Sequence, residues 1–227
     1  MNFRPALLTT AIATLLAATP LDAASPMGPV NIPQRAEIPK AHHPLAFFIQ
    51  RFENDLESTE HTYDITAGLA REAALRNLYL GWQARLGEFD PAALGPEDRI
   101  DAALFRRELD YRLKQLDFEH ARNVQALALL PEVDALIVLA EQRRALKPLD
   151  ADKAKRLIER AARALQENQD PLRSGNATSP VIALRASKLL SAFREDFKQW
   201  HTFYNGYDPA YSKQVAKSYE ALDKQFE

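Results

Sequence analysis

Residues 96–120, PEDRIDAALFRRELDYRLKQLDFEH, place apolar side chains on two opposite sides of a helix. At about 100° per residue, the two rows are Ile100, Leu104, Tyr111 and Phe118, and Phe105, Leu109, Leu113 and Leu116. An ordinary surface helix has a single apolar stripe. Two opposed stripes predict that other helices pack on both sides. We therefore expect a central helix near 96–120 within an all-α bundle or array that contains no sheet.

The composition is that of a soluble globular protein and excludes several classes of function. Of the 227 residues, 46% are hydrophobic and 26% are charged. With only seven glycines and no sustained apolar–polar alternation, strands and phosphate-binding loops are not expected. A net charge of −2 gives no electrostatic case for a nucleic-acid partner. Because cysteine is absent, the chain has no disulfide, thiolate metal site or cysteine nucleophile.

The first 23 residues have the pattern of a signal peptide, so we expect export to the periplasm or the extracellular space. Arg4 supplies a positive start, residues 6–18 are uncharged and mostly apolar, and residues 21–23 resemble a cleavage site. The alternative is an uncleaved membrane anchor, but the apolar run is too short to span a bilayer comfortably. After cleavage we expect no stable membrane insertion.

Residues 24–43 contain four prolines and no periodic apolar pattern, which predicts an extended linker. His42 and His43 at its end have no partner at metal-ligand spacing, so we interpret them as part of a solvated loop. Residues 44–227 are expected to form one α-helical domain.

Six further amphipathic segments predict helices around the central one. They are Leu45–Leu56, Thr66–Gly87, a helix from about Glu132, Asp152–Asn168, a long helix from Val181, and a last helix that begins after Asp208-Pro209. Breaks are expected at 58–64 and 170–180. Gly87 is placed to end the second helix, and Gly95 with Pro96 to begin the central one.

The apolar row of the last helix stays in phase to the penultimate residue. Its members are Tyr211, Val215, Tyr219, Leu222 and Phe226. No glycine, proline or polar tail follows, although helices usually end with a cap or a frayed polar turn. We therefore expect the N-terminal portion of a longer protein, with a natural short end as the alternative.

No catalytic or metal-binding motif is recognisable. None of the five histidines begins a His-Glu-x-x-His zinc motif, and Gly-x-Ser-x-Gly and phosphate-loop motifs are absent. The best isolated carboxylates are Glu108 and Asp110, which we expect to pair with Arg106, Arg107 and Arg112 on the helix surface. We therefore assign no catalytic, cofactor-binding or metal-ligating residue and expect no cofactor in this chain.

Three segments resemble, in order, the N-terminal part of the bacterial family called domain of unknown function 885. They are LAFFIQRFENDLES from Leu45, LGEFDPAALGPEDRIDAALFRRELDYRLKQLDFE from Leu86 to Glu119, and PLDADKAKRLIERAARAL from Pro148. The middle segment is the most specific, and the similarity covers most of Leu45–Glu227. Near His61 the chain departs from the glycine- and aspartate-containing segment that is usual in the family.

The resemblance implies an exported, all-helical, metallopeptidase-like hydrolase that is typically more than twice as long. Family members carry a His-Glu zinc-binding motif in a C-terminal half, which this sequence lacks. Zinc is therefore expected only in that missing half, and no ligand or catalytic residue transfers to a position of this chain. The implied partners are the C-terminal half and a peptide substrate, and we expect the present chain to be inactive alone.

Two other classes of function are compatible with the same residues. One is a self-contained periplasmic helical protein that acts as a binding or scaffold module. The other is a helix-bundle adaptor that oligomerises through its last helix. The surface distinguishes the N-terminal portion of a longer protein from a self-contained one. A chain that lacks its partner leaves apolar area exposed, whereas a self-contained domain buries it.

Overall fold

The computed structural model describes residues 43–173 and 179–226, which form helices joined by short loops, with no strand in these ranges. The expected all-α array without a sheet is confirmed. The predicted signal peptide and the predicted linker up to residue 42 lie outside the described residues. The helices are α1 (Pro44–Thr62), α2 (Leu69–Leu86), α3 (Pro96–Leu127), α4 (Val133–Arg144), α5 (Ala151–Arg173), α6 (Pro180–Tyr207), α7 (Pro209–Gln214) and α8 (Ala216–Asp223).

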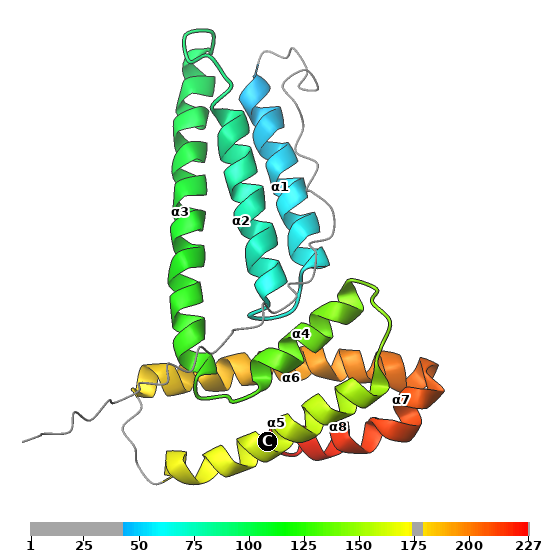
Figure 1. Cartoon of the computed structure of the whole chain (residues 1–227). Coiled ribbons are helices and arrows are strands. Elements are labelled where there is room, and N and C mark those ends of the chain that lie inside the picture. Colours follow the sequence, from blue (N-terminus) through cyan, green and yellow to red (C-terminus); the bar gives the residue numbers. More distant parts are fainter. Residues whose placement is uncertain (1–42, 174–178, 227) are drawn as a thin grey trace, which may run out of the picture.

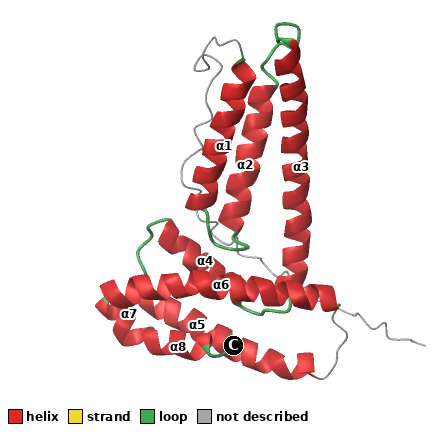
Figure 2. Ribbon diagram, turned by 180° about the vertical axis from the view of Figure 1, so that it is seen from behind, coloured by secondary structure: helices red, strands yellow, loops and turns green. Residues whose placement is uncertain are grey.

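The helices form two parts, which we call the upper bundle and the lower layer. In the upper bundle α1, α2 and α3 stand side by side, and α4–α8 lie across its lower end as the lower layer (Figure 1). The view from behind shows the same division (Figure 2). Each part has its own hydrophobic cluster. α3 connects them, because Phe105 and Leu109 belong to the upper cluster and Ala126 to the lower one.

Aromatic rings fill the core of the upper bundle. Phe48 and Phe52 of α1 meet the buried Trp82 of α2 edge-on, with ring centroids 4.6 and 5.8 Å apart. Phe105 of α3 lies 5.0 Å from the Phe52 ring. The four-residue spacing of the two α1 rings puts both on one helix face. Edge-to-face pairs add about 0.5–1.5 kcal/mol beyond area burial, so this cluster holds the three helices together.

The lower layer combines an aromatic stack with a helix of small side chains. Phe197 and Trp200 of α6 stack with centroids 4.7 Å apart, and Tyr211 of α7 meets Trp200 edge-on at 5.3 Å. The buried face of α5 carries Ala154 and Ala161, which permit the close approach of α8. The predicted aromatic stripe of α6 is therefore part of a packed core.

The prediction that helices pack on both sides of α3 is wrong for the described residues. Phe105 and Leu109 are buried, but the opposite row, which we call the α3 row, is exposed. Its members and exposed fractions are Ile100 61%, Leu104 61%, Tyr111 57% and Phe118 47%. Within the described chain, α1 and α2 pack against the other side of α3 (Figure 1). An apolar helix face predicts a partner but does not say in which part of a protein that partner lies.

Three helices extend beyond their predicted limits. α1 continues through the expected polar break to Thr62, because polar residues without glycine or proline do not stop a helix. The Thr59 hydroxyl donates to the Asp55 carbonyl oxygen, one turn earlier in the helix, at 2.7 Å. α3 continues to Leu127, since apolar residues carry its spacing into the lower cluster. α5 continues to Arg173, into the expected loop 170–180, although the sequence there contains Asp170 and Pro171, which are poor helix formers.

Three predicted helix ends are confirmed. Gly87 follows α2 as its C-cap, and α3 begins at Pro96 with Gly95 as its N-cap. The Asp208 carboxylate accepts hydrogen bonds from two backbone N–H groups in the first turn of α7, at 2.8 and 3.2 Å. Capping residues are local signals, which is why the sequence alone identifies them.

The predicted last helix is divided at Val215, where the backbone φ of −110° interrupts the helical run. Its apolar row is nevertheless internal, because Tyr211, Val215, Tyr219 and Leu222 are all buried in the lower layer. The row therefore packs against α5 and α6. Oligomerisation through this face is not available without opening the lower layer.

Asp98 at the start of α3 caps the start of α1. Its side chain is 3% exposed and accepts a hydrogen bond from the Leu45 backbone N–H at 3.3 Å. Asp98→Ala is expected to lower the free energy of unfolding by about 1–2 kcal/mol, because that donor is left unpaired. Urea denaturation followed by circular dichroism measures the change. Asp101→Ala, one turn further along α3, is the control and should cost less than about 0.5 kcal/mol. Equal losses from both variants would refute the capping role.

Candidate functional site

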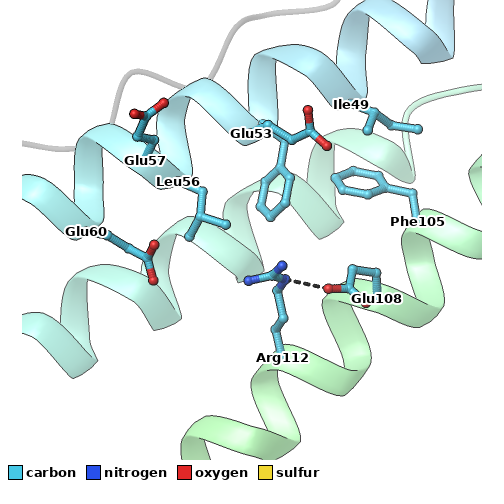
Figure 3. Close-up of a pocket in the computed structure, with 9 residues that line it drawn as sticks. Ile49, Glu53, Leu56, Glu57, Glu60, Phe105, Glu108 and Arg112 are labelled. Atoms are coloured by element: carbon cyan, nitrogen blue, oxygen red, sulfur yellow. Dashed lines mark hydrogen bonds and ion pairs between the residues drawn. The ribbon is translucent and has the colours of Figure 1, made fainter.

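A groove of about 320 Å³ lies between α1 and α3 in the upper bundle (Figure 3). We call it the α1–α3 groove. Its floor is apolar and its rims carry four glutamates and one arginine. The lining residues are Ile49, Phe52, Leu56 and Phe105, and Glu53, Glu57, Glu60, Glu108 and Arg112. An apolar floor with a few charged groups is the usual make-up of a site that binds an amphipathic ligand.

Arg112 is fixed in position within this groove. Its guanidinium donates to the Glu108 carboxylate at 2.7 Å and lies 5.9 Å from the ring centroids of both Phe52 and Tyr79. Burial lowers the pKa of Arg112, but hydrogen bonds with Tyr79 and Glu108 raise it by more, so the net pKa is raised. The group is a permanent cation held by a carboxylate and two aromatic faces.

The α1 rim is acidic. Glu53, Glu57 and Glu60 are exposed and follow at four- and three-residue intervals, which puts them along one side of the helix. Glu60 pairs with Arg71 of α2 at 3.2 Å. Within the described part of the chain, Glu53 and Glu57 form no ion pair, so this rim presents negative charge to solvent. Such a rim attracts cationic groups, and salt weakens the attraction.

A second pocket of about 270 Å³ lies between the start of α2 and the lower half of α3. His120 contacts the Glu72 carboxylate at 2.7 Å, and Arg76 bridges Glu72 at 3.1 Å and Asp117 at 2.8 Å. The network contains no serine, threonine or cysteine that could act as a nucleophile beside the histidine. These groups pair with one another across α2 and α3, which is a structural role.

Two other described histidines, His43 and His201, also have partners. His43 lies 3.6 Å from Glu97, on the surface. His201 lies 2.6 Å from the Tyr211 hydroxyl and stacks on Tyr219 with centroids 3.9 Å apart. Burial lowers the pKa of His201 and raises that of Tyr219 to about 12. The cluster is therefore a set of neutral rings that pack in the lower layer.

No group of three histidine, cysteine, aspartate or glutamate side chains in residues 43–173 and 179–226 is placed to hold a metal ion. In the same ranges, no helix is both long enough and apolar enough to cross a bilayer.

The two carboxylates singled out in the sequence have different partners. Glu108 pairs with Arg112 as predicted. Asp110 instead accepts a hydrogen bond from the Gln83 amide of α2 at 2.5 Å, so it ties two helices together. The groove itself was not predicted from the sequence. The sequence signal for one wall is the spacing of Glu53 and Glu57, four residues apart beside Phe52. This signal is not sufficient, because the opposite wall comes from α3, more than 40 positions away in the sequence.

Comparisons of the chain with protein-family models, with curated proteins and with solved structures find no match. The resemblance of the three sequence segments to the family called domain of unknown function 885 therefore stays a prediction.

Proposed function

We propose that the chain is the N-terminal helical portion of an exported, metallopeptidase-like hydrolase and is inactive alone. In this proposal the α3 row binds the C-terminal half of the same protein, and the α1–α3 groove forms one wall of a peptide channel. The sequence resemblance supplies the class of protein. The exposed α3 row is the observation that carries the proposal.

The α3 row is costly to leave in water. Four large apolar side chains, each close to half exposed or more, lie in one line along a helix. At about 25 cal/mol per Å², a few hundred Å² of such surface costs several kcal/mol. That is comparable to the net stability of a whole domain. Contiguous apolar surface of this size typically marks an interaction site, which supports a protein partner on this face.

The α3 row and the α1–α3 groove lie on adjacent sides of one helix. Glu108 and Arg112 of the groove lie on the helix surface between the row and the opposite, buried face that carries Phe105. A partner that covers the row therefore borders the groove and closes it into a channel. The free carboxylate rim favours a peptide with basic side chains, whose methylene stems fit the apolar floor.

The resemblance implies zinc in the C-terminal half. Because the described residues bring no three ligand side chains together, we assign the metal to no residue of this chain and derive no catalytic step here. The role that remains for the described helices is to bind and orient a substrate.

Binding in trans tests the proposed partner. The 227-residue chain, mixed with the separately expressed remainder of its reading frame, should give a complex in size-exclusion chromatography with light scattering. Leu104→Glu should weaken this complex at least tenfold, because the charge would be buried in an apolar interface. The control is Leu80→Glu, which changes a similarly exposed leucine of α2. Absence of a complex, or equal weakening by both variants, refutes the proposal.

Peptide binding tests the groove separately. The assembled protein should bind an extended peptide of alternating arginine and leucine, and added salt should weaken the binding. The double variant Glu53→Gln, Glu57→Gln should lose about 1 kcal/mol of affinity for this peptide. It should lose no affinity for a control peptide in which each arginine is replaced by glutamine. Unchanged affinity for the arginine peptide would show that the groove is not the binding surface.

The second candidate is a self-contained periplasmic helical binding or scaffold protein. The observation that favours it is the buried row of α7 and α8, since this face needs no further partner. It predicts a soluble monomer that does not bind a hydrophobic dye and unfolds in one cooperative transition. Strong dye fluorescence that decreases in Leu104→Glu argues for the first candidate instead.

A further inference from the structure

The loop between α1 and α2 connects the upper bundle to the lower layer through three carboxylates. The Thr66 backbone N–H donates to Asp196 of α6 at 2.9 Å. The Ala70 backbone N–H, in the first turn of α2, donates to Glu141 of α4 at 2.9 Å. In the third contact, Asp64 of the loop pairs with Arg144 of α4. Two of these contacts depend on a carboxylate of the lower layer that accepts a backbone hydrogen bond from the upper bundle.

The two accepting carboxylates are poorly solvated. Glu141 is 8% exposed and fits against Gly68, where a Cβ atom would overlap its Oε1. Asp196 is half-buried between α6 and the loop. Neither has an ion pair of its own within the described chain. A Cβ atom at position 68 would therefore displace the Glu141 carboxylate from this position, and the contact puts two acidic groups in a site with little water.

We propose that this contact is a carboxylate latch, in which Glu141 and Asp196 hold the upper bundle on the lower layer. The closed latch becomes more stable when these two carboxylates take up protons. The reason is the cost of burying charge. An ionised carboxylate loses hydration when the latch closes, whereas a neutral carboxyl loses much less. The neutral group still accepts the backbone hydrogen bond through its carbonyl oxygen. The closed latch is therefore the state that binds protons more tightly.

The pKa shifts have the direction that this argument requires. Burial raises the pKa of Glu141 above 4.5, and the hydrogen bond from Ala70 opposes this only in part. Burial also raises the pKa of Asp196 above 3.8, against the bonds from Thr66. Because the pKa of each carboxyl group is raised in the closed state, protonation stabilises the latch fully at a pH below the ordinary pKa of the group. This stabilisation is lost as the pH rises through the raised value.

The surrounding charged groups add smaller effects of both signs. Asp64 of the loop and Arg144 of α4 act on Asp196, and Arg143 of α4 interacts in turn with these two groups and with Tyr204 of α6. Asp64 raises the pKa of Asp196 and Arg144 lowers it. Arg71 of α2 is directed elsewhere, to the Tyr63 carbonyl oxygen and Glu60. The test must therefore change Glu141 and Asp196 while it leaves the Asp64–Arg144 pair in place.

Amide hydrogen exchange measures the latch directly, because the Thr66 and Ala70 N–H groups are its donors. The protection factors of these two amides, corrected for intrinsic exchange, are compared between the wild type and the double variant Glu141→Gln, Asp196→Asn. The variant keeps both acceptor oxygens but cannot titrate. As the pH falls from neutral toward 4.5, the ratio of wild-type to variant protection should rise. Each unit of pKa difference between the closed and open states corresponds to about tenfold.

A flat or falling ratio overturns the proposal. Glu195→Gln, which neutralises an exposed neighbour on α6, is the matched control and should respond to pH as the wild type does. A loss of the response in this control would also overturn it. If the double variant does not fold, Glu141→Gln alone is compared through the Ala70 amide, with the same expected rise and the same contradicting result.

Discussion

Trp82→Ala is expected to lower the free energy of unfolding of the upper bundle by about 3–5 kcal/mol. Trp82 is fully buried, and its ring contacts Phe48 and Phe52, so its removal leaves a cavity at the meeting point of α1 and α2. Urea denaturation followed by circular dichroism measures the loss. Leu80→Ala removes an exposed side chain of the same helix and is expected to change the free energy by less than about 0.5 kcal/mol.

The same variant distinguishes the two cores. The chain has two tryptophans, so Trp200 is the remaining tryptophan in Trp82→Ala, and its fluorescence reports on the lower layer. If the two hydrophobic clusters are separate, the circular dichroism signal should begin to fall at lower urea than the Trp200 fluorescence changes. Coincident transitions would show that the two clusters unfold as one unit.

Trp200→Ala is expected to have an effect of similar size in the lower layer, about 3–5 kcal/mol. The Trp200 ring stacks on Phe197 at 4.7 Å and meets Tyr204 and Tyr211 edge-on at 5.2 and 5.3 Å. Its loss therefore removes contacts within α6 and between α6 and α7. Trp82 fluorescence then reports on the upper bundle, and urea denaturation by both signals measures the change.

The control for this variant is Phe203→Ala, because Phe203 lies on the same helix but is 46% exposed. It should cost well under half as much as Trp200→Ala, since little of its area is buried. Equal costs would mean that the aromatic stack does not carry the stability of the lower layer.

Local signals allowed much of the fold to be predicted from the sequence. Gly95 with Pro96, and Asp208, act within one helical turn, so their effect depends on neighbouring residues that the sequence displays directly. The apolar rows of α6 and of the last two helices are periodic over many residues, which fixes the buried face. Thr59 shows the limit of this approach, because a run of polar residues looks like a break even where one of them is buried within the helix.

The partner of α3 could not be predicted from its pattern. The sequence shows two apolar faces, and the described chain covers only the face that carries Phe105. Periodicity reports which side chains avoid water but not what covers them, so the prediction of helices on both sides failed for the face that carries Leu104.

The groove and the latch were not predictable for a different reason. Each depends on side chains that are distant in sequence, such as Thr66 and Asp196, which are 130 positions apart. The glutamates of the groove look like an ordinary solvated helix face until α3 is placed beside them. Gly68 is similar, since the carboxylate that a Cβ atom there would displace belongs to Glu141 on another helix. Only the tertiary structure brings these groups together.

Solvent labelling of Tyr111 and Phe118 in the native protein tests the proposed interface most directly. Hydroxyl-radical oxidation of the two rings, read by mass spectrometry, is compared between the isolated 227-residue chain and the polypeptide purified from its source cells. We predict strong oxidation of both rings in the isolated chain and protection of both in the native protein, which should have a larger intact mass. Equal oxidation of the two rings in both samples would contradict the assignment of the α3 row as a buried contact.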